Sequence, residues 1–199
     1  IFKNNLKDPL ALARLLGAAG VNPLHEAVVI SDQGITKESA LAFILLEQLG
    51  QKKVSIFIDT MGYWSKRGFA LKKDPTVVAP KKVRHDLAVP PVNYQVKPGK
   101  AVIADPNSTK GLYPKIFIAS GKTIPSQAVE GKVVHVPYTE LLNEDGSPKP
   151  AKDIWNIIYK AGVTRYAEII CFSDDPGEAA INYFIMKLMG FPDIKVLVF

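Results

Sequence analysis

Two kinds of hydrophobic pattern recur along this chain. Short apolar runs predict β-strands at residues 27–31, 54–58, 101–105, 115–119, 133–136, 168–172 and 194–198. Longer segments, with apolar residues three or four positions apart, predict helices at residues 9–19, 37–49, 61–67, 150–159 and 178–190. Strands and helices alternate, which predicts an α/β fold with a mostly parallel sheet covered by helices on both faces.

One part of this pattern occurs twice. Residues 19–32 and 161–174 share the order Ala-Gly-Val, six further residues, and a strand ending in Ser-Asp, at a constant offset of 142. Each copy is followed by an apolar helix, a glycine and another strand. A β–α–β unit can arise twice by convergence, but this shared order favours the duplication of one domain.

Composition limits the possible functions. Of the 199 residues, 47% are hydrophobic and 22% are charged, as in an ordinary globular protein. No apolar run approaches the roughly 18–20 residues of a membrane-spanning helix, so we expect no transmembrane segment. Much of the net charge of +6 lies in the Lys- and Pro-rich residues 72–98 and just beyond them. This stretch predicts a solvated linker, or else a patch for an acidic partner or a membrane surface, and no nucleic-acid binding.

Cysteine and histidine usage gives little support for metal chemistry. Cys171 is the single cysteine, which excludes an internal disulfide and a cysteine-based metal cluster. His25, His85 and His135 are far apart and lack the spacing of metal ligands. We therefore expect neither a metal nor a cofactor. The compartment, cytoplasmic or periplasmic, stays open.

The strand predicted at 168–172 leads directly into a turn and then a helix. Such a junction directs backbone N–H groups and the positive end of a helix dipole to one point, where α/β folds bind anions. The candidate loop at this junction consists of Ser173, Asp174, Asp175, Pro176, Gly177 and Glu178.

Three other segments carry longer motifs. Val136-Pro-Tyr-Thr-Glu-Leu-Leu142, followed by an Asp-Gly pair, is similar to the pattern NVPxxxLLxxDG. Gly190-Phe-Pro-Asp-Ile-Lys-Val196 is similar to GxxDVxVY, and Trp64 and Gly68 match GGxxxWxxxG. With these motifs the chain resembles the rhodanese (thiosulfate sulfurtransferase) family in its tandem-domain form.

The resemblance implies a division into two α/β domains. Residues 1–71 would be the C-terminal half of a first rhodanese-like domain, residues 72–98 a linker, and residues 99–199 a second domain. The first copy would be incomplete at its N-terminus and the second at its C-terminus. We therefore expect a fragment, or a polypeptide whose remaining parts are separate.

The resemblance also assigns roles to the candidate loop. In the family, a cysteine on this loop accepts a sulfur atom as a persulfide. Here that position falls on Ser173, whose hydroxyl cannot form a persulfide. Asp174, Asp175 and Glu178 add negative charge that repels an anionic donor. Asp32 stands at the equivalent position of the first copy, where the family commonly has an aspartate and no activity.

Cys171 leaves an alternative open. It lies two residues before Ser173, so strand alternation directs both side chains to one face. A slipped turn would make Cys171 the nucleophile of a thiosulfate or related sulfurtransferase; otherwise it is a small buried core residue. We expect no sulfurtransferase activity, and a binding or structural module that meets its partner through the linker or the interdomain cleft. The alternatives are the Cys171 enzyme and a pseudoenzyme subunit of a larger redox or envelope complex.

Overall fold

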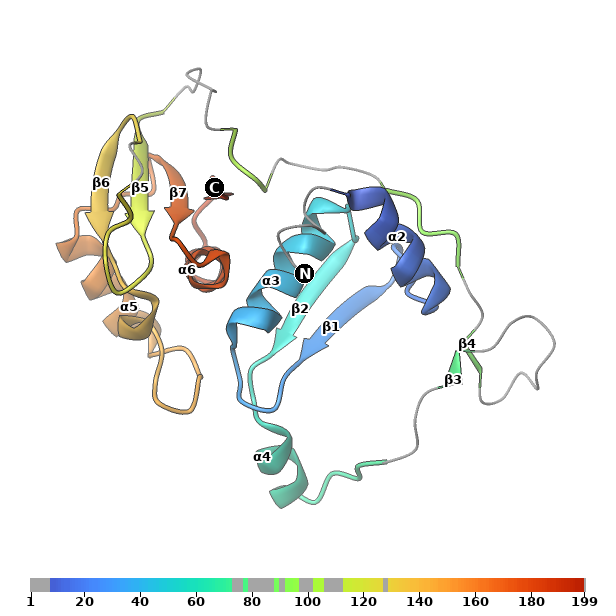
Figure 1. Ribbon diagram of the computed structural model, residues 1–199. Coiled ribbons are helices and arrows are strands. Elements are labelled where there is room, and N and C mark those ends of the chain that lie inside the picture. The colour runs from blue at the N-terminus through green and yellow to red at the C-terminus, as the bar shows by residue number, and fades with distance from the viewer. Residues whose placement is uncertain are drawn as a thin grey trace.

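The computed structural model describes residues 8–72, 77–78, 88–89, 92–96, 102–105, 113–126 and 129–198 (Figure 1). The first part of the chain forms α2 (Pro9–Ala18), β1 (Glu26–Ile30), α3 (Lys37–Gln48), β2 (Lys53–Phe57) and α4 (Met61–Lys66). Two short strands follow, β3 (Val77–Val78) and β4 (Ala88–Val89). The last part forms β5 (Lys115–Ala119), β6 (Lys132–His135), the 3-10 helix η1 (Tyr138–Glu140), α5 (Ala151–Lys160), β7 (Glu168–Phe172), α6 (Pro176–Leu188) and β8 (Ile194–Leu197).

The second half of the chain contains a four-stranded parallel sheet in the order β6-β5-β7-β8. The α/β class and the parallel pairing predicted from the alternating pattern are confirmed. The strand predicted at 101–105 is reduced, among its described residues, to an isolated bridge between Ile103 and Val196. The backbone N–H of Ala104 donates to the carbonyl oxygen of Val196 at 2.8 Å, so this segment follows β8 for one bridge only.

The two faces of this sheet are covered differently. Alternate residues of its strands, among them Ile118 and Cys171, join α5 and α6 in one large hydrophobic core. The opposite face, with Phe117, Ile170 and Phe172, forms a smaller cluster that includes Ala104 and packs against Val129. The sequence pattern placed helices on both faces. Within the described residues, both helices of this half lie on one face, because their apolar sides share a single core.

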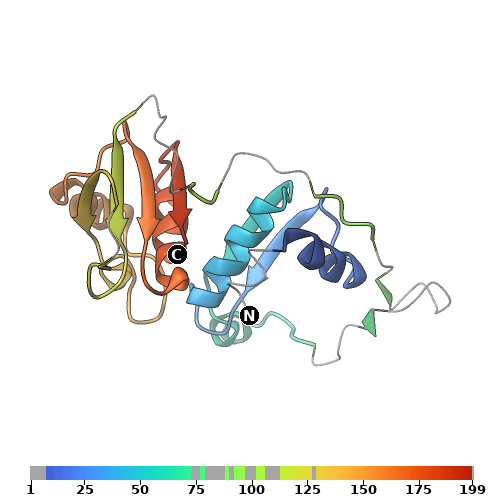
Figure 2. The ribbon, with the colours of Figure 1, turned by 45° about the horizontal axis from the view of Figure 1, so that its top comes forward.

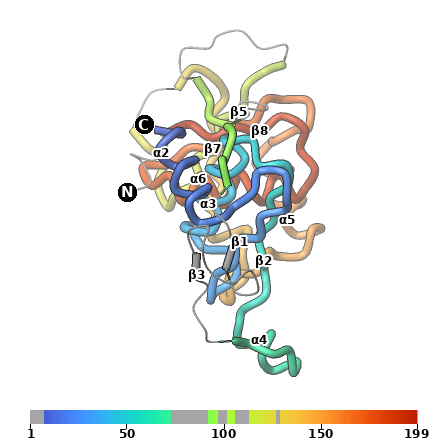
Figure 3. The backbone as a smooth tube through the Cα atoms, turned by 90° about the vertical axis from the view of Figure 1, so that its right-hand side faces the viewer, coloured from blue at the N-terminus to red at the C-terminus, as the bar shows by residue number. Residues whose placement is uncertain are grey.

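The first half contains a second, two-stranded parallel sheet of β1 and β2. Helix α3 covers one face of this sheet through the large core, which includes Ile44 and Ile56. On the other face, Val28 and Ile30 are exposed. Helix α4 extends away from both sheets (Figure 3), and its Trp64 ring packs against Phe57, with ring centroids 5.3 Å apart.

The two sheets are joined by direct packing of α3 against α6. Figure 2 shows α3 lying between its own sheet and the α6 side of the second one. The Phe43 ring meets the Phe184 ring edge-on, with centroids 5.0 Å apart. The Tyr183 hydroxyl donates to Glu47 at 2.7 Å, and Lys187 forms an ion pair with the same carboxylate. The described parts of both halves therefore share one hydrophobic core.

Residues 72–98, predicted as a solvated linker, are described only in part. The described residues 92–96 pack back onto the first half instead of remaining in solvent. Tyr94 is buried beside Ala13 and Leu49, and its hydroxyl donates to Gln51 at 2.7 Å. The buried tyrosine ring accounts for this difference from the prediction, because burying an aromatic ring stabilises a packed arrangement.

The repeated sequence pattern has a structural counterpart. The units β1–α3–β2 and β7–α6–β8 have the same order of elements and the same parallel pairing. Their origin by duplication, and the proposed domain boundaries, stay predictions. Among the residues that the structure describes, no helix is both long and apolar enough to cross a membrane.

Candidate functional site

The candidate loop connects the central strand β7 to α6. Ser173 follows the last residue of β7, and Asp175 caps the helix by accepting a hydrogen bond from the backbone N–H of Gly177 at 2.9 Å. Pro176 occupies the first helical turn, where its missing N–H costs nothing. The helix therefore begins at Pro176, two residues before the predicted start at Glu178.

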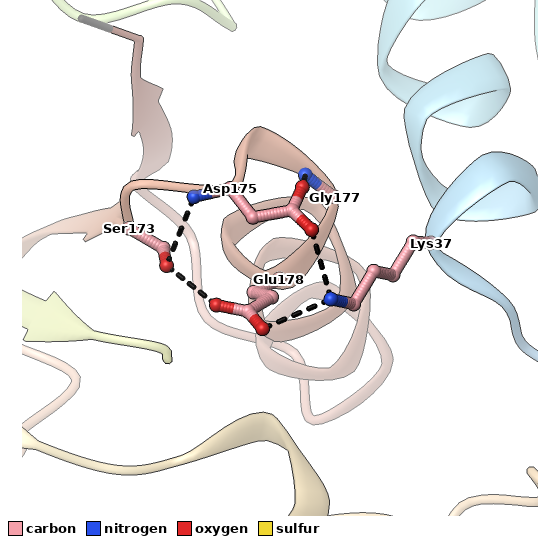
Figure 4. A network of polar contacts seen from close by, with 5 residues as sticks. All are labelled: Lys37, Ser173, Asp175, Gly177 and Glu178. Atoms are coloured by element: carbon pink, nitrogen blue, oxygen red, sulfur yellow. Dashed lines mark hydrogen bonds and ion pairs between the residues drawn. The ribbon is translucent and has the colours of Figure 1, made fainter. Parts of the chain in front are cut away.

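The centre of the loop is occupied by the Glu178 side chain (Figure 4). One carboxylate oxygen, Oε2, accepts a hydrogen bond from the Ser173 hydroxyl at 2.7 Å. The other, Oε1, lies 2.9 Å from the Nζ of Lys37, which also contacts Asp175 at 2.8 Å. Lys37 is the first residue of α3 and therefore comes from the first half of the chain.

These contacts hold Lys37 in its charged form. Burial by itself lowers the pKa of Lys37, but its hydrogen bonds to Asp175 and Glu178 outweigh burial and raise the pKa well above the ordinary value. Lys37 is thus a permanent cation at neutral pH. Its single charge offsets only part of the loop's negative charge, and it is not a proton acceptor for Ser173.

Gly121 closes the side of the loop facing β5. A Cβ atom at this position would lie 2.7 Å from Oε2 of Glu178 and 2.8 Å from Oγ of Ser173. The Gly121 carbonyl oxygen also lies 2.9 Å from Nε2 of His135. Ser173 is buried. Because the Gly121 backbone lies so close, the side chains of Ser173 and Glu178 have little room to move apart.

Cys171 lies beneath the loop and not within it. Its side chain is fully buried in the large core with α6. Burial raises the pKa of the Cys171 thiol well above its ordinary value. A thiolate is the nucleophilic form of cysteine, so this position disfavours nucleophilic chemistry.

A cavity of about 630 Å³ lies next to the loop, between the two halves of the chain. The first half supplies Asp32, at the position predicted from the repeat, together with the start of α3. The second half supplies Tyr138, whose ring centroid lies 5.4 Å from Nζ of Lys37. The full lining is Asp32, Gln33, Ile35, Thr36, Lys37, Glu38, Thr60, Tyr138, Glu144, Asp145, Gly146 and Ile181.

The sequence identified the loop but missed the residues that surround it. Asp174, predicted as part of the acidic loop, is exposed at its rim. No local sequence pattern connects Lys37, Gly121 or His135 with the loop. These residues come from other strands, from the segments that follow them, or from the other half of the chain. Three neighbouring carboxylates imply a nearby cation, but local sequence does not reveal which lysine supplies it. Among the described residues, no group of three or more His, Cys, Asp or Glu side chains could hold a metal ion.

Comparison with known proteins shows which of them this chain resembles. No family model matches the chain. A protein of Synechococcus elongatus named "Putative thiosulfate sulfurtransferase" is 25% identical over 204 residues, covering 95% of this chain and 62% of that protein. The structure of SseA from Escherichia coli, a 3-mercaptopyruvate sulfotransferase with the rhodanese fold, matches with a TM-score of 0.72. The chain has the rhodanese fold.

The structural likeness extends over most of this rhodanese-like chain. SseA is 18% identical and matches 95% of this chain and 71% of its own. EanB matches 95% of this chain and 50% of its own, with 14% identity and a TM-score of 0.73. The chain spans 62% of the Synechococcus protein, which is less than two thirds of its length. At 14–18% identity, the solved structures establish the fold alone.

Proposed function

We propose that this rhodanese-like chain does not carry sulfur and that it acts as a binding or structural module. The observation that carries the proposal is the hydrogen bond between Ser173 and Glu178, with Lys37 on the other side of the carboxylate. A serine becomes a nucleophile when a base removes its proton. The base here would be a carboxylate already paired with an ammonium group, which leaves Ser173 unactivated.

The Glu178 side chain also disfavours binding of an anionic sulfur donor. An anion bound at the start of α6 would meet the carboxylates of Asp175 and Glu178, and the positive charge of Lys37 is already shared between them. The neighbouring cavity adds Asp32, Glu38, Glu144 and Asp145. Like charges repel a donor such as thiosulfate, so the cleft suits a neutral or cationic partner better.

The alternative, a sulfurtransferase that uses Cys171, would require the thiol to leave the core. Exposing the thiol would require packed side chains of β7 and α6 to separate. Binding of a sulfur donor at the loop does not by itself separate them. We therefore favour the non-catalytic function. The basic linker partner and the larger redox or envelope complex remain hypotheses, because most of residues 72–98 lie outside the described residues.

The test is an assay of thiocyanate release in the presence of cyanide, with thiosulfate and 3-mercaptopyruvate as donors. We expect no release above the buffer rate, with SseA as the positive control. Mass spectrometry after incubation with either donor should show no added sulfur atom. Turnover or a persulfide that disappears in Cys171→Ser, but not in Ser173→Ala, would overturn the proposal and establish the Cys171 enzyme.

A matched pair of variants tests why the loop is inactive. Ser173→Cys restores the thiol but keeps Glu178 in the loop, whereas Ser173→Cys combined with Glu178→Ala also removes the competing carboxylate. We expect the double variant to accept sulfur from thiosulfate faster than the single variant. Equal rates would show that Glu178 does not obstruct the donor.

A further inference from the structure

A second cavity lies on the second half of the chain, away from the candidate loop. It measures about 440 Å³, within the range of roughly 300–1,000 Å³ found for small-molecule sites. The cavity lies between the end of α5 and the turn that precedes β7, whereas Ser173 follows the opposite end of β7. Its lining residues are Trp155, Tyr159, Val163, Thr164, Arg165 and Tyr166.

Aromatic rings dominate the walls of this cavity. Tyr159 is 69% exposed and Tyr166 is 81% exposed, although large aromatic side chains usually bury most of their surface. Trp155 stacks on Tyr159 with ring centroids 6.5 Å apart and an angle of 26° between the ring planes. Exposed rings around a hollow provide flat surfaces on which a planar ligand can stack.

Arg165 gives the cavity a fixed positive charge. Its guanidinium carbon lies 5.1 Å from the centroid of the Trp155 ring and 5.8 Å from that of Phe191. One of its nitrogens, Nη2, donates to the carbonyl oxygen of Met189 at 2.9 Å, which sets the direction of the planar group. No acidic residue lines the cavity.

The C-terminal end of a helix normally repels anions, because its last carbonyl groups have no partner within the helix. Here these carbonyl oxygens accept local hydrogen bonds. Ile157 accepts from Ala161 at 3.1 Å, Ile158 from Val163 at 3.0 Å, and Tyr159 from Gly162 at 2.9 Å. This capping reduces the repulsion, so the charge of Arg165 determines which ligands the cavity favours.

We propose that the cavity formed by Trp155, Tyr159, Arg165 and Tyr166 binds a planar aromatic anion, meaning an aromatic ring that carries a phosphate or carboxylate group. The ring stacks on the tyrosine side chains, and the anionic group pairs with Arg165. This site is independent of the function proposed for the loop, because it shares no lining residue with the cleft.

Trp155 provides a direct reporter for binding. The chain has two tryptophans, so Trp64→Phe leaves Trp155 as the single one. In this background we expect adenosine monophosphate, used as the probe, to quench Trp155 fluorescence in a saturable manner. Adenosine has the ring without the charge and ribose 5-phosphate has the charge without the ring, so both should bind at least about tenfold more weakly.

Variants of the lining residues connect the signal to the site. Tyr166→Ala should weaken adenosine monophosphate binding by about tenfold, as expected for the loss of one stacking ring. Tyr63→Ala, which removes a partly exposed tyrosine from α4, should leave the affinity unchanged. Arg165→Gln should weaken binding, and Arg165→Lys should retain part of it.

Three results would overturn the proposal. The first is the absence of saturable quenching with adenosine monophosphate. The second is equal affinity for ribose 5-phosphate with no effect of Tyr166→Ala, which would indicate charge attraction alone. The third is equal affinity for adenosine with no effect of Arg165→Gln. Circular dichroism of each variant separates a change in binding from a loss of folding.

Discussion

Lys37 and Glu178 form an ion pair at 2.9 Å although they are 141 positions apart in the sequence. Lys37 begins α3 and Glu178 lies in the first turn of α6, so the pair joins the starts of the two helices that pack against each other. The contact links the halves of the chain at the candidate loop. It also places a cation from one half among the carboxylates of the other.

Replacing Lys37 should destabilise the whole described fold. In Lys37→Met, Glu178 remains largely buried, with 16% of its side chain exposed, and loses its cation. We expect the free energy of unfolding to fall by about 1–2 kcal/mol, between the values typical of exposed and buried ion pairs. Urea denaturation followed by circular dichroism measures the change. Lys52→Met, at an exposed position, is the matched control and should have little effect.

The contribution of Lys37 to the free energy of unfolding should depend on pH only under alkaline conditions. Its pKa is raised in the folded protein, so the folded state retains the proton at a pH where the unfolded state has lost it. The stabilisation is therefore fully present below the unfolded pKa of about 10.4 and decreases as pH rises through the folded pKa. The difference in unfolding free energy between wild type and Lys37→Met should stay constant from about pH 7 to 10 and shrink above it. A steady decline across neutral pH would contradict this assignment.

Cys171 should be unreactive in the folded protein. Its side chain is fully buried and burial raises the pKa of the thiol, so both access and the thiolate fraction are low. A chromogenic disulfide reagent should label Cys171 slowly in native buffer and rapidly after unfolding in urea. Rapid labelling of the native protein, at the rate of a free thiol in solution, is the result that this burial does not allow.

Gly146 should tolerate no side chain. It lines the cavity between the two halves of the chain and contacts the first half closely. Its carbonyl oxygen accepts from the backbone N–H of Ile35 at 3.0 Å. Its φ angle is +77°, and a Cβ atom would lie 2.2 Å from the carbonyl oxygen of Gln33. Gly146→Ala should therefore lower the unfolding free energy by at least about 1–2 kcal/mol. Thermal denaturation provides the measurement.

Gly62 provides the matched control for Gly146. It lies within α4, and the nearest atom to an added Cβ would be 3.8 Å away. Gly62→Ala should leave stability unchanged or raise it by about 0.5–1 kcal/mol, since alanine favours a helix. A similar loss in both variants would mean that the contact with Gln33 is not the cause.

Much of the fold followed from local patterns. The strand at 168–172, the helix after it and the parallel arrangement were all predictable, because buried strands and amphipathic helices have different hydrophobic periods. The sequence predicts the start of α6 two residues late, because Pro176 is typical of a turn as well as of a first helical residue. The packed segment around Tyr94 was missed because Pro and Lys dominate its sequence neighbours.

Three properties can be derived from the amino-acid order alone: the succession of strands and helices, the absence of cysteine from the candidate loop, and the acidic character of that loop. These properties depend on residue types and short spacings, which are visible in the chain. Three contacts become visible only in the folded chain: Lys37 pairs with Glu178, the Gly121 backbone lies close to Ser173, and α6 encloses Cys171. The first contact depends on how α3 packs against α6, and the other two depend on how β5 and α6 pack against β7. No local pattern encodes which residues of such separate elements meet.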